Sequence, residues 1–99
     1  MVLFTALIFT VAAADPVVTV VNGTGTDMYY LYIGKSDEWS DDLLDDDIIE
    51  PGESFQTSLP AGTWDISFED EDGYTYTKYE VRITRDTVIK ITEDDEDDE

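Results

Sequence analysis

The amino-acid sequence predicts an all-β fold, an antiparallel Ig-like β-sandwich of about six or seven short strands. Three observations support this prediction. Runs of β-branched and aromatic residues recur at intervals of about ten residues, and most of them alternate between apolar and polar side chains. Gly and Pro residues stand between the runs, as they do at turns. No segment has the spacing of apolar residues that is typical of an amphipathic helix.

The first two expected strands are Pro16–Val21 and Asp27–Gly34, with a turn at Asn22–Gly25 between them. The second strand is apolar on both faces. Its two faces are Tyr29, Leu31 and Ile33 on one side and Met28, Tyr30 and Tyr32 on the other. We therefore expect either a central strand that is covered on both faces or a strand that displays tyrosines.

The longest polar connection, Lys35–Asp47, contains three apolar side chains. We expect Leu43 and Leu44 to turn inward at the edge of the core, because large apolar residues are most often buried. Trp39 would then cover them as a lid at one end of the sandwich. The alternative is that the leucine pair anchors a partner.

Four further strands follow, at Ser54–Leu59, Thr63–Glu69, Tyr74–Ile83 and Thr87–Thr92. The turn Asp70–Gly73 lies between two alternating strands and is the clearest hairpin of the sequence. Alternation predicts which side chains of these strands point into the core. They are Phe55, Thr57, Leu59, Trp64, Ile66, Phe68, Tyr79, Val81, Ile83, Ile89 and Ile91.

The two ends of the chain differ from the middle in composition. Residues 1–14, MVLFTALIFTVAAA, carry no charge and end in three alanines, the small-residue pattern at which signal peptidase cleaves. Residues 93–99, EDDEDDE, are all acidic. We expect residues 1–14 to be a secretory signal peptide, although no Lys or Arg precedes its apolar run. Residues 15–92 would form the β-sandwich domain, residues 93–99 would be a disordered acidic tail, and the protein would be exported to the periplasm or the exterior.

Charge and composition exclude several classes of function. The chain has 25 acidic and 5 basic residues, a formal net charge of −20, and neither Cys nor His. The missing Cys and His exclude thiol chemistry, disulfides and the usual zinc and copper ligand sets. The negative charge argues against binding to nucleic acids and to anionic membranes.

We expect no enzymatic activity. A domain of this size has little room for a deep cleft. Glycoside hydrolysis needs two carboxyl groups across a cleft, but a chain with 25 acidic residues contains close carboxylate pairs by chance.

Two acidic segments are candidate metal sites. The loop Asp41–Asp47 and the turn Asp70–Gly73 could supply carboxylate oxygens to a hard cation such as calcium. The candidate ligands are Asp42, Asp45, Asp70 and Asp72. The turn does not fit an EF-hand, because Phe68 and Tyr79 would occupy its first and twelfth positions. The alternative is that these residues are solvated turn acids; no other cofactor is expected.

Four tyrosines, Tyr30, Tyr32, Tyr74 and Tyr76, could form an aromatic strip on the outside of the sheet. Flat aromatic faces can stack on sugar rings, and neighbouring acids can accept hydrogen bonds from sugar hydroxyls. The alternative is ordinary cross-strand aromatic pairing.

Five segments together resemble a group of small exported bacterial proteins of uncharacterised function. They are VTVVNGTG, YYLYIGKS, WSDDLL, IEPGES and LPAGTWDISFEDEDG, between Val18 and Gly73. The group shares N-x-T-G, L-Y-(I/V)-S-x-S, W-G-x-D-L-L, P-G-x-S and L-P-x-G-x-(Y/W)-D-(I/V). This chain differs at Ser40, where the group has Gly, and at Gly34, where it often has Ser. The resemblance extends over about Val17–Ile83 and implies a β-sandwich and export, but no reaction.

The sequence therefore predicts a non-enzymatic, exported β-sandwich that serves as a binding or structural module of the cell envelope, with weak calcium binding through its acidic loops. Its ligand would be a protein or a carbohydrate of the envelope. Two alternatives stay open. The acidity could be an adaptation to a saline environment without a specific metal site, since Asp outnumbers Glu 16 to 9 and Lys occurs only 3 times. The protein could also be an acidic inhibitor or decoy of a basic partner.

Overall fold

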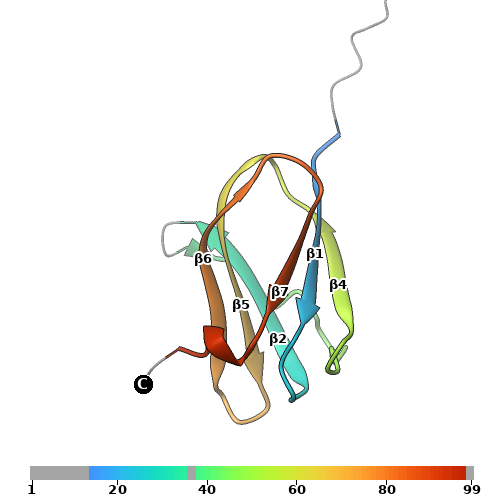
Figure 1. Ribbon diagram of the computed structural model, residues 1–99, viewed down its shortest axis with the longest axis vertical. Helices are drawn as coiled ribbons and strands as arrows, with labels where there is room; N and C mark the ends of the chain where they lie inside the picture. The colour runs from blue at the N-terminus through green and yellow to red at the C-terminus, as the bar shows by residue number, and fades with distance from the viewer. Residues whose placement is uncertain (1–13, 36–37, 98–99) are drawn as a thin grey trace, which may run out of the picture.

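The computed structural model describes residues 14–35 and 38–97, which form two β-sheets packed face to face (Figure 1). The strands are β1 (Val17–Asn22), β2 (Met28–Lys35), β3 (Glu38–Trp39), β4 (Ser54–Ser58), β5 (Gly62–Asp70), β6 (Thr75–Ile83) and β7 (Thr87–Ile91), and the 3₁₀-helix η2 (Glu93–Asp95) follows them. The predicted all-β sandwich is thus confirmed. In the described part of the chain, no helix is long and apolar enough to span a membrane.

Sheet A has the strand order β4-β1-β7, and sheet B has the order β3-β2-β5-β6. All neighbouring strands are antiparallel except β1 and β7, which pair in parallel, so the expectation of a wholly antiparallel sandwich is wrong. The reason is that both strands begin at the same end of the sandwich, where the Val17 N–H donates to Asp86 Oδ1 at 2.8 Å. The short connection from β6 to β7 crosses from sheet B to sheet A at that end (Figure 1).

The core lies between the two sheets and is formed by one cluster of apolar side chains that includes the ring of Tyr76. Its buried side chains are Val18, Val20, Met28, Leu31, Ile33, Leu44, Ile49, Leu59, Ile66, Phe68, Tyr76, Ile83, Ile89 and Ile91. The alternating residues of β4, β5 and β7 point inward as predicted. Burial of these side chains is the main source of stability, at about 1.5–3 kcal/mol for each large one.

Strand β6 departs from the predicted alternation. Tyr76 is buried, and Tyr79, which was expected in the core, is 62% exposed. The cause is a β-bulge: the pairing of β5 with β6 shifts by one residue between Trp64 and Ile66, and Glu80 takes a left-handed φ of 55°. Because the extra residue of a bulge shifts the alternation of side chains by one position, Thr75, Thr77 and Tyr79, which precede Glu80, lie on the face opposite to Val81 and Ile83, which follow it.

The long connection after β3 runs along the outer edge of β2. The Ser40 and Leu43 N–H groups donate to the carbonyls of Ile33 and Leu31, each at 2.9 Å. Leu44 is 1% exposed, and Leu43 packs against the core, as predicted for this pair. Trp39 does not cover them: it lies beside Gly34, 42% exposed on the outer face of sheet B.

The acidic residues 93–97, part of the segment 93–99 that was expected to be a disordered tail, pack against the sandwich. Residues 98–99 lie outside the described residues, as do residues 1–13 of the expected signal peptide. Glu96 bridges to Tyr76, and the Asp97 N–H donates to the Thr75 carbonyl at 2.8 Å, so the segment pairs with the outer edge of β6. The Lys78–Asp95 ion pair at 3.1 Å and the bond from Gly25 N–H to Glu93 Oε2 at 2.7 Å hold it in place.

Candidate ligand-binding groove

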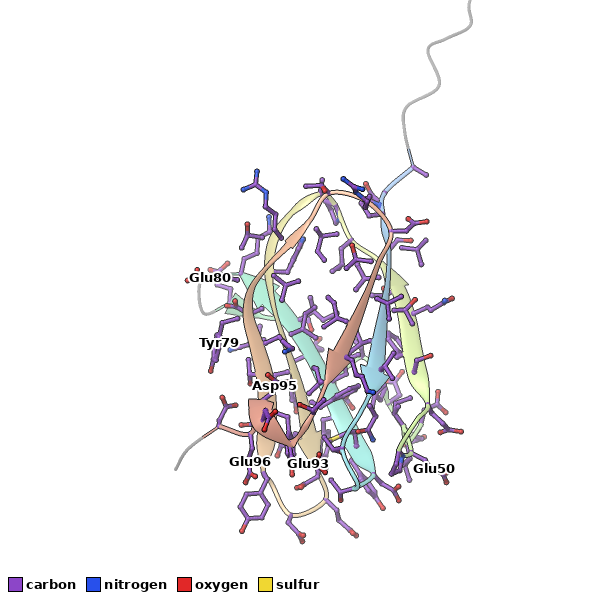
Figure 2. All side chains as sticks on the ribbon, in the orientation of Figure 1. Glu50, Tyr79, Glu80, Glu93, Asp95 and Glu96 are labelled. Carbon is purple, nitrogen blue, oxygen red and sulfur yellow. The ribbon has the colours of Figure 1, made fainter. Side chains whose placement is uncertain are left out.

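A groove of about 390 Å³ lies on the outer face of sheet B. Its lining comes from β2, β3, β5, β6 and the C-terminal acidic segment. The lining residues are Tyr32, Trp39, Ser40, Ser67, Thr75, Thr77, Tyr79 and Asp97. Figure 2 shows Tyr79 on the side of β6 that faces away from sheet A, while Glu50 lies on the far side of the molecule.

The strand register explains why these residues meet. Tyr32 of β2 stands opposite Ser67 of β5, and Ser67 stands opposite Thr77 of β6. These three residues form one row across the sheet. Since side chains of a strand alternate between its faces, this row lies outside while Ile66, Phe68 and Tyr76 of the same strands lie in the core.

The hollow comes from small residues placed between large ones. Ser67 and Thr77 form its floor, and Trp39 and Tyr79 stand at the two edge strands β3 and β6. Gly34 lets the backbone of β3 approach β2 closely beside Trp39, because a Cβ atom at Gly34 would collide with the Glu38 carbonyl group. Three strand spacings, about 14 Å, separate the edge strands, so the groove is long and shallow.

Hydrogen bonds link the hydroxyl groups of the floor to one carboxylate. Thr75 and Thr77 donate from Oγ1 to Asp97 Oδ2, each at 2.6 Å, and Tyr79 OH donates to Asp97 Oδ1 at 3.4 Å. Ser67 Oγ lies 2.9 Å from Thr77 Oγ1. Ser67 and Thr77 are only 6% and 7% exposed, so this network is the base of the groove and not a set of loose surface contacts.

The surroundings of the groove are aromatic and negative. The rings of Tyr30 and Tyr32 stack with centroids 6.4 Å apart and planes within 8°. Burial raises the pKa of the Tyr32 hydroxyl above its ordinary value, and the nearby charges of Glu69 and Asp42 raise it further. No basic side chain is among the described residues that line the groove. The groove therefore presents neutral hydroxyls, aromatic faces and one carboxylate.

The predicted metal ligands of the long connection have a structural role here. Asp42 Oδ1 accepts hydrogen bonds from the Leu31 and Leu44 N–H groups, both at 3.0 Å, and so holds the connection against β2. Asp45 is exposed and has a left-handed φ of 54°, a conformation that Asp tolerates better than most residues. The contacts of Asp42 therefore stabilise the loop that places Leu43 and Leu44 against the core.

The predicted ligands of the hairpin also bind backbone groups. Asp70 is buried, and its Oδ1 accepts from the N–H groups of Asp72 and Tyr74, both at 3.0 Å. Its Oδ2 accepts from Tyr76 OH at 3.3 Å. Burial first, and then the Asp70 charge, raise the pKa of Tyr76 to about 12. Asp72 is exposed in the turn.

The two acidic segments do not meet. Asp42 binds the edge of β2 that faces the long connection, whereas Asp70 pairs with Met28 across the other edge of β2. Within residues 14–35 and 38–97, no three acidic side chains are grouped closely enough to hold a metal ion.

The predicted strip of four tyrosines is only half formed. Tyr30 and Tyr32 lie on the outer face, but Tyr76 is buried and Tyr74 belongs to the hairpin turn. Sequence reasoning missed Trp39, Tyr79 and Asp97 as groove residues. The alternation of Thr75 and Thr77 with Tyr76 could have indicated that the two threonines share the outer face. Nothing in the run EDDEDDE distinguishes Asp97 from its neighbours.

No protein-family model, no curated protein and no solved structure matches this chain.

Proposed function

We propose that the protein is an exported, non-enzymatic module of the cell envelope with an Ig-like β-sandwich fold, and that it binds a carbohydrate in the groove of sheet B. One observation carries this proposal: aromatic side chains flank a hydrogen-bonded row of hydroxyls that ends in a carboxylate. Export is supported by the sequence of residues 1–14 and by the resemblance to exported proteins.

A sugar chain suits both the shape and the chemistry of the groove. Its volume is within the range of about 300–1,000 Å³ that is common for small-molecule sites. The apolar faces of sugar rings can pack on Trp39, Tyr32 and Tyr79, while sugar hydroxyls reach Asp97 and the floor. A groove about 14 Å long accommodates more than one ring. A compact cation would contact only one of the two aromatic edge residues, Trp39 and Tyr79, because their strands lie about 14 Å apart.

Other ligand classes suit the groove less well. Anionic ligands are repelled by a chain with a net charge of −20. A purely apolar ligand would cover Asp97 and the remaining acceptor lone pairs of the floor without offering donors to them. An extended peptide usually adds to an open sheet edge. In sheet B, the Ser40 and Leu43 N–H groups already bond to the edge of β2 beyond β3, and Glu96 and Asp97 already pair with one end of β6.

The test is calorimetric titration with three neutral tetrasaccharides, namely cellotetraose, maltotetraose and mannotetraose. We expect at least one to bind, and we expect Trp39→Ala to weaken that binding at least tenfold. Tyr74→Ala is the matched control, because Tyr74 is 45% exposed, close to the 42% of Trp39, but lies in the hairpin outside the groove. If Trp39→Ala binds as tightly as wild type, the groove is not the binding site.

The acidity favours a second, separate proposal, that the surface is adapted to a saline environment. Among the described residues, Lys78 and Asp95 form the one ion pair. Most other carboxylates in that part of the chain have no basic side chain to neutralise them, so only mobile ions can do so. A calcium site formed by Asp42, Asp45, Asp70 and Asp72 would need the two loops to move together. Thermal unfolding in sodium chloride and in calcium chloride separates these ideas. Capture of a basic protein that persists at moderate salt would instead support the inhibitor hypothesis.

A further inference from the structure

We infer that Asp97 fixes the hydrogen-bonding polarity of the groove floor, the row of Ser67, Thr75 and Thr77, so that the floor favours ligand groups which donate hydrogen bonds over groups which only accept them. This inference rests on the proposed function, because it names the chemical class of carbohydrate that the same groove would take. It makes Asp97 a specificity-determining residue.

The hydroxyl hydrogens of Thr75 and Thr77 both point to Asp97. An ionised carboxylate has no hydrogen to give and acts only as an acceptor. In the bonds of Thr75 Oγ1 and Thr77 Oγ1 to Asp97 Oδ2, both at 2.6 Å, the threonines must therefore be the donors. Each hydroxyl has a single hydrogen, so neither threonine can donate to anything else while Asp97 is in place.

The direction of the threonine hydrogens also fixes the direction of the Ser67 hydrogen. Ser67 Oγ lies 2.9 Å from Thr77 Oγ1, and the distance alone leaves the donor undecided. Since the hydrogen of Thr77 already points to Asp97, Ser67 must be the donor in this pair. Tyr79 also donates to Asp97, at 3.4 Å. The hydrogens of the row thus all point along the network toward one carboxylate.

The floor offers a ligand only hydrogen-bond acceptors. The oxygens of Ser67, Thr75 and Thr77 keep only lone pairs to offer, and Asp97 offers lone pairs as well. Sugar hydroxyls and amino groups can donate to these atoms. Carboxylates, sulfates and ether oxygens would meet lone pair against lone pair, which leaves both sides unsatisfied and is unfavourable. The negative charge of the chain disfavours the anionic members of that set in addition.

The position of Asp97 is fixed well enough for this role. Its own N–H donates to the Thr75 carbonyl at 2.8 Å, and Glu96 bridges to Tyr76. The segment begins with a capped 3₁₀ turn: the Thr92 side chain accepts from the Asp94 N–H, and Asp95 accepts from the Thr92 N–H. Figure 2 shows Glu93, Asp95 and Glu96 gathered at one end of β6.

The test compares the best-binding neutral tetrasaccharide with its fully O-methylated derivative and with tetragalacturonate. O-methylation keeps the ring faces and the acceptor oxygens but removes every O–H donor. We expect wild type to bind the methylated sugar and the uronate at least tenfold more weakly than the parent sugar. Asp97→Ala removes the acceptor and frees the hydrogens of Thr75 and Thr77, so this variant should distinguish the parent sugar from the methylated sugar much less than wild type does. Glu96→Gln, outside the groove lining, is the matched control and should keep wild-type affinity.

The outcomes separate the two proposals. If the methylated sugar binds as well as the parent sugar, or if a folded Asp97→Ala distinguishes the two sugars as strongly as wild type does, the inference is wrong while carbohydrate binding stands. If wild type binds none of the neutral sugars, both proposals are wrong. Proton NMR of the free protein adds a ligand-independent measurement: the hydroxyl protons of Thr75 and Thr77 should exchange slowly with water in wild type and quickly in Asp97→Ala.

Discussion

Two acidic segments of this chain look alike in sequence and differ in what their carboxylates do. The connection Asp41–Asp47 contains five aspartates, and the C-terminal segment Glu93–Asp97 is entirely acidic. In the connection, Asp42 accepts hydrogen bonds from two backbone N–H groups and Leu44 is buried in the core. In the C-terminal segment, Asp97 accepts hydrogen bonds from side-chain hydroxyls on the outer face of a sheet.

The difference shows that the partners of a carboxylate, and not its acidic neighbours, decide its role. A carboxylate whose oxygens bind backbone N–H groups fixes a loop, because those bonds shape the chain. A carboxylate at the end of a hydroxyl row leaves that row accessible to a ligand. We therefore expect changes in the first segment to alter stability and changes around the second to alter binding.

The largest effect on stability should come from Leu44→Ala. The side chain is 1% exposed and packs in the core, so its truncation removes buried methyl groups and leaves a cavity. We expect the free energy of unfolding in urea to fall by about 2–5 kcal/mol, while the protein that remains folded binds sugar with wild-type affinity. A fall below 1 kcal/mol would mean that the connection does not contribute to the core.

Asp42→Ala should have the next largest effect. It leaves the Leu31 and Leu44 N–H groups without their acceptor, which costs about 1–3 kcal/mol when such groups are buried. Asp46→Ala is the matched control in the same loop, because Asp46 is exposed, and it should change the free energy of unfolding by less than about 0.5 kcal/mol. Equal losses in both variants would contradict the assigned role of Asp42.

Thr77→Val keeps the shape of the side chain and removes the central hydroxyl of the groove floor. We expect a loss of about 1 kcal/mol in stability and at least a tenfold loss in affinity for the bound tetrasaccharide. Thr19→Val is the control on sheet A, where Thr19 Oγ1 accepts from Gln56 Nε2 at 3.1 Å. That variant should change stability by a similar amount and leave the affinity unchanged, since it is remote from the groove.

The pH dependence of stability should report on the hairpin carboxylate. The pKa of Tyr76 is raised to about 12 in the folded protein by burial and by Asp70, against about 10 for a tyrosine in an unfolded chain. The stabilising contribution is therefore complete below pH 10 and is lost as the pH rises from 10 through 12.

We expect Tyr76 to contribute on the order of 1 kcal/mol to the fall in unfolding free energy between pH 9 and pH 11, after solvent screening. Tyr76→Phe should remove this part of the pH dependence. If wild type and variant show parallel curves, the Tyr76 hydroxyl is not perturbed by its surroundings.

The smallest expected effect is that of calcium. Because the described acidic side chains form no group that could hold a metal ion, calcium should raise the melting temperature no more than sodium chloride at matched ionic strength. A larger shift with calcium, abolished by Asp72→Asn but not by Asp46→Asn, would support the predicted metal site and change the interpretation of both acidic segments.

Much of the fold could be predicted from the sequence, because alternation and turn residues are local signals. The inward residues of β4, β5 and β7 and the hairpin at Asp70–Gly73 were predicted in this way and are confirmed. The parallel pairing of β1 with β7 joins distant parts of the chain and leaves no local signal. The bulge at Glu80 shifts the alternation by one residue, so Tyr79 was predicted on the wrong face.

The groove could be predicted only in part for the same physical reason. Tyr30 and Tyr32 belong to one strand, and their outward position was one of the two expected possibilities. The meeting of Trp39, Ser67, Thr77 and Asp97 depends on the order of strands in sheet B and on the pairing of the C-terminal segment with β6. Sequence composition described that segment only as a run of like charges, which is typical of disordered tails.

The most direct test of the account is a two-dimensional NMR titration of the full protein with the tetrasaccharide that binds best. We expect the chemical-shift changes to concentrate on the Trp39 indole and on Tyr32, Ser67, Thr75, Thr77 and Asp97. Changes that concentrate instead on sheet A or on the connection Asp41–Asp47 would place the ligand elsewhere and contradict the groove as the functional site.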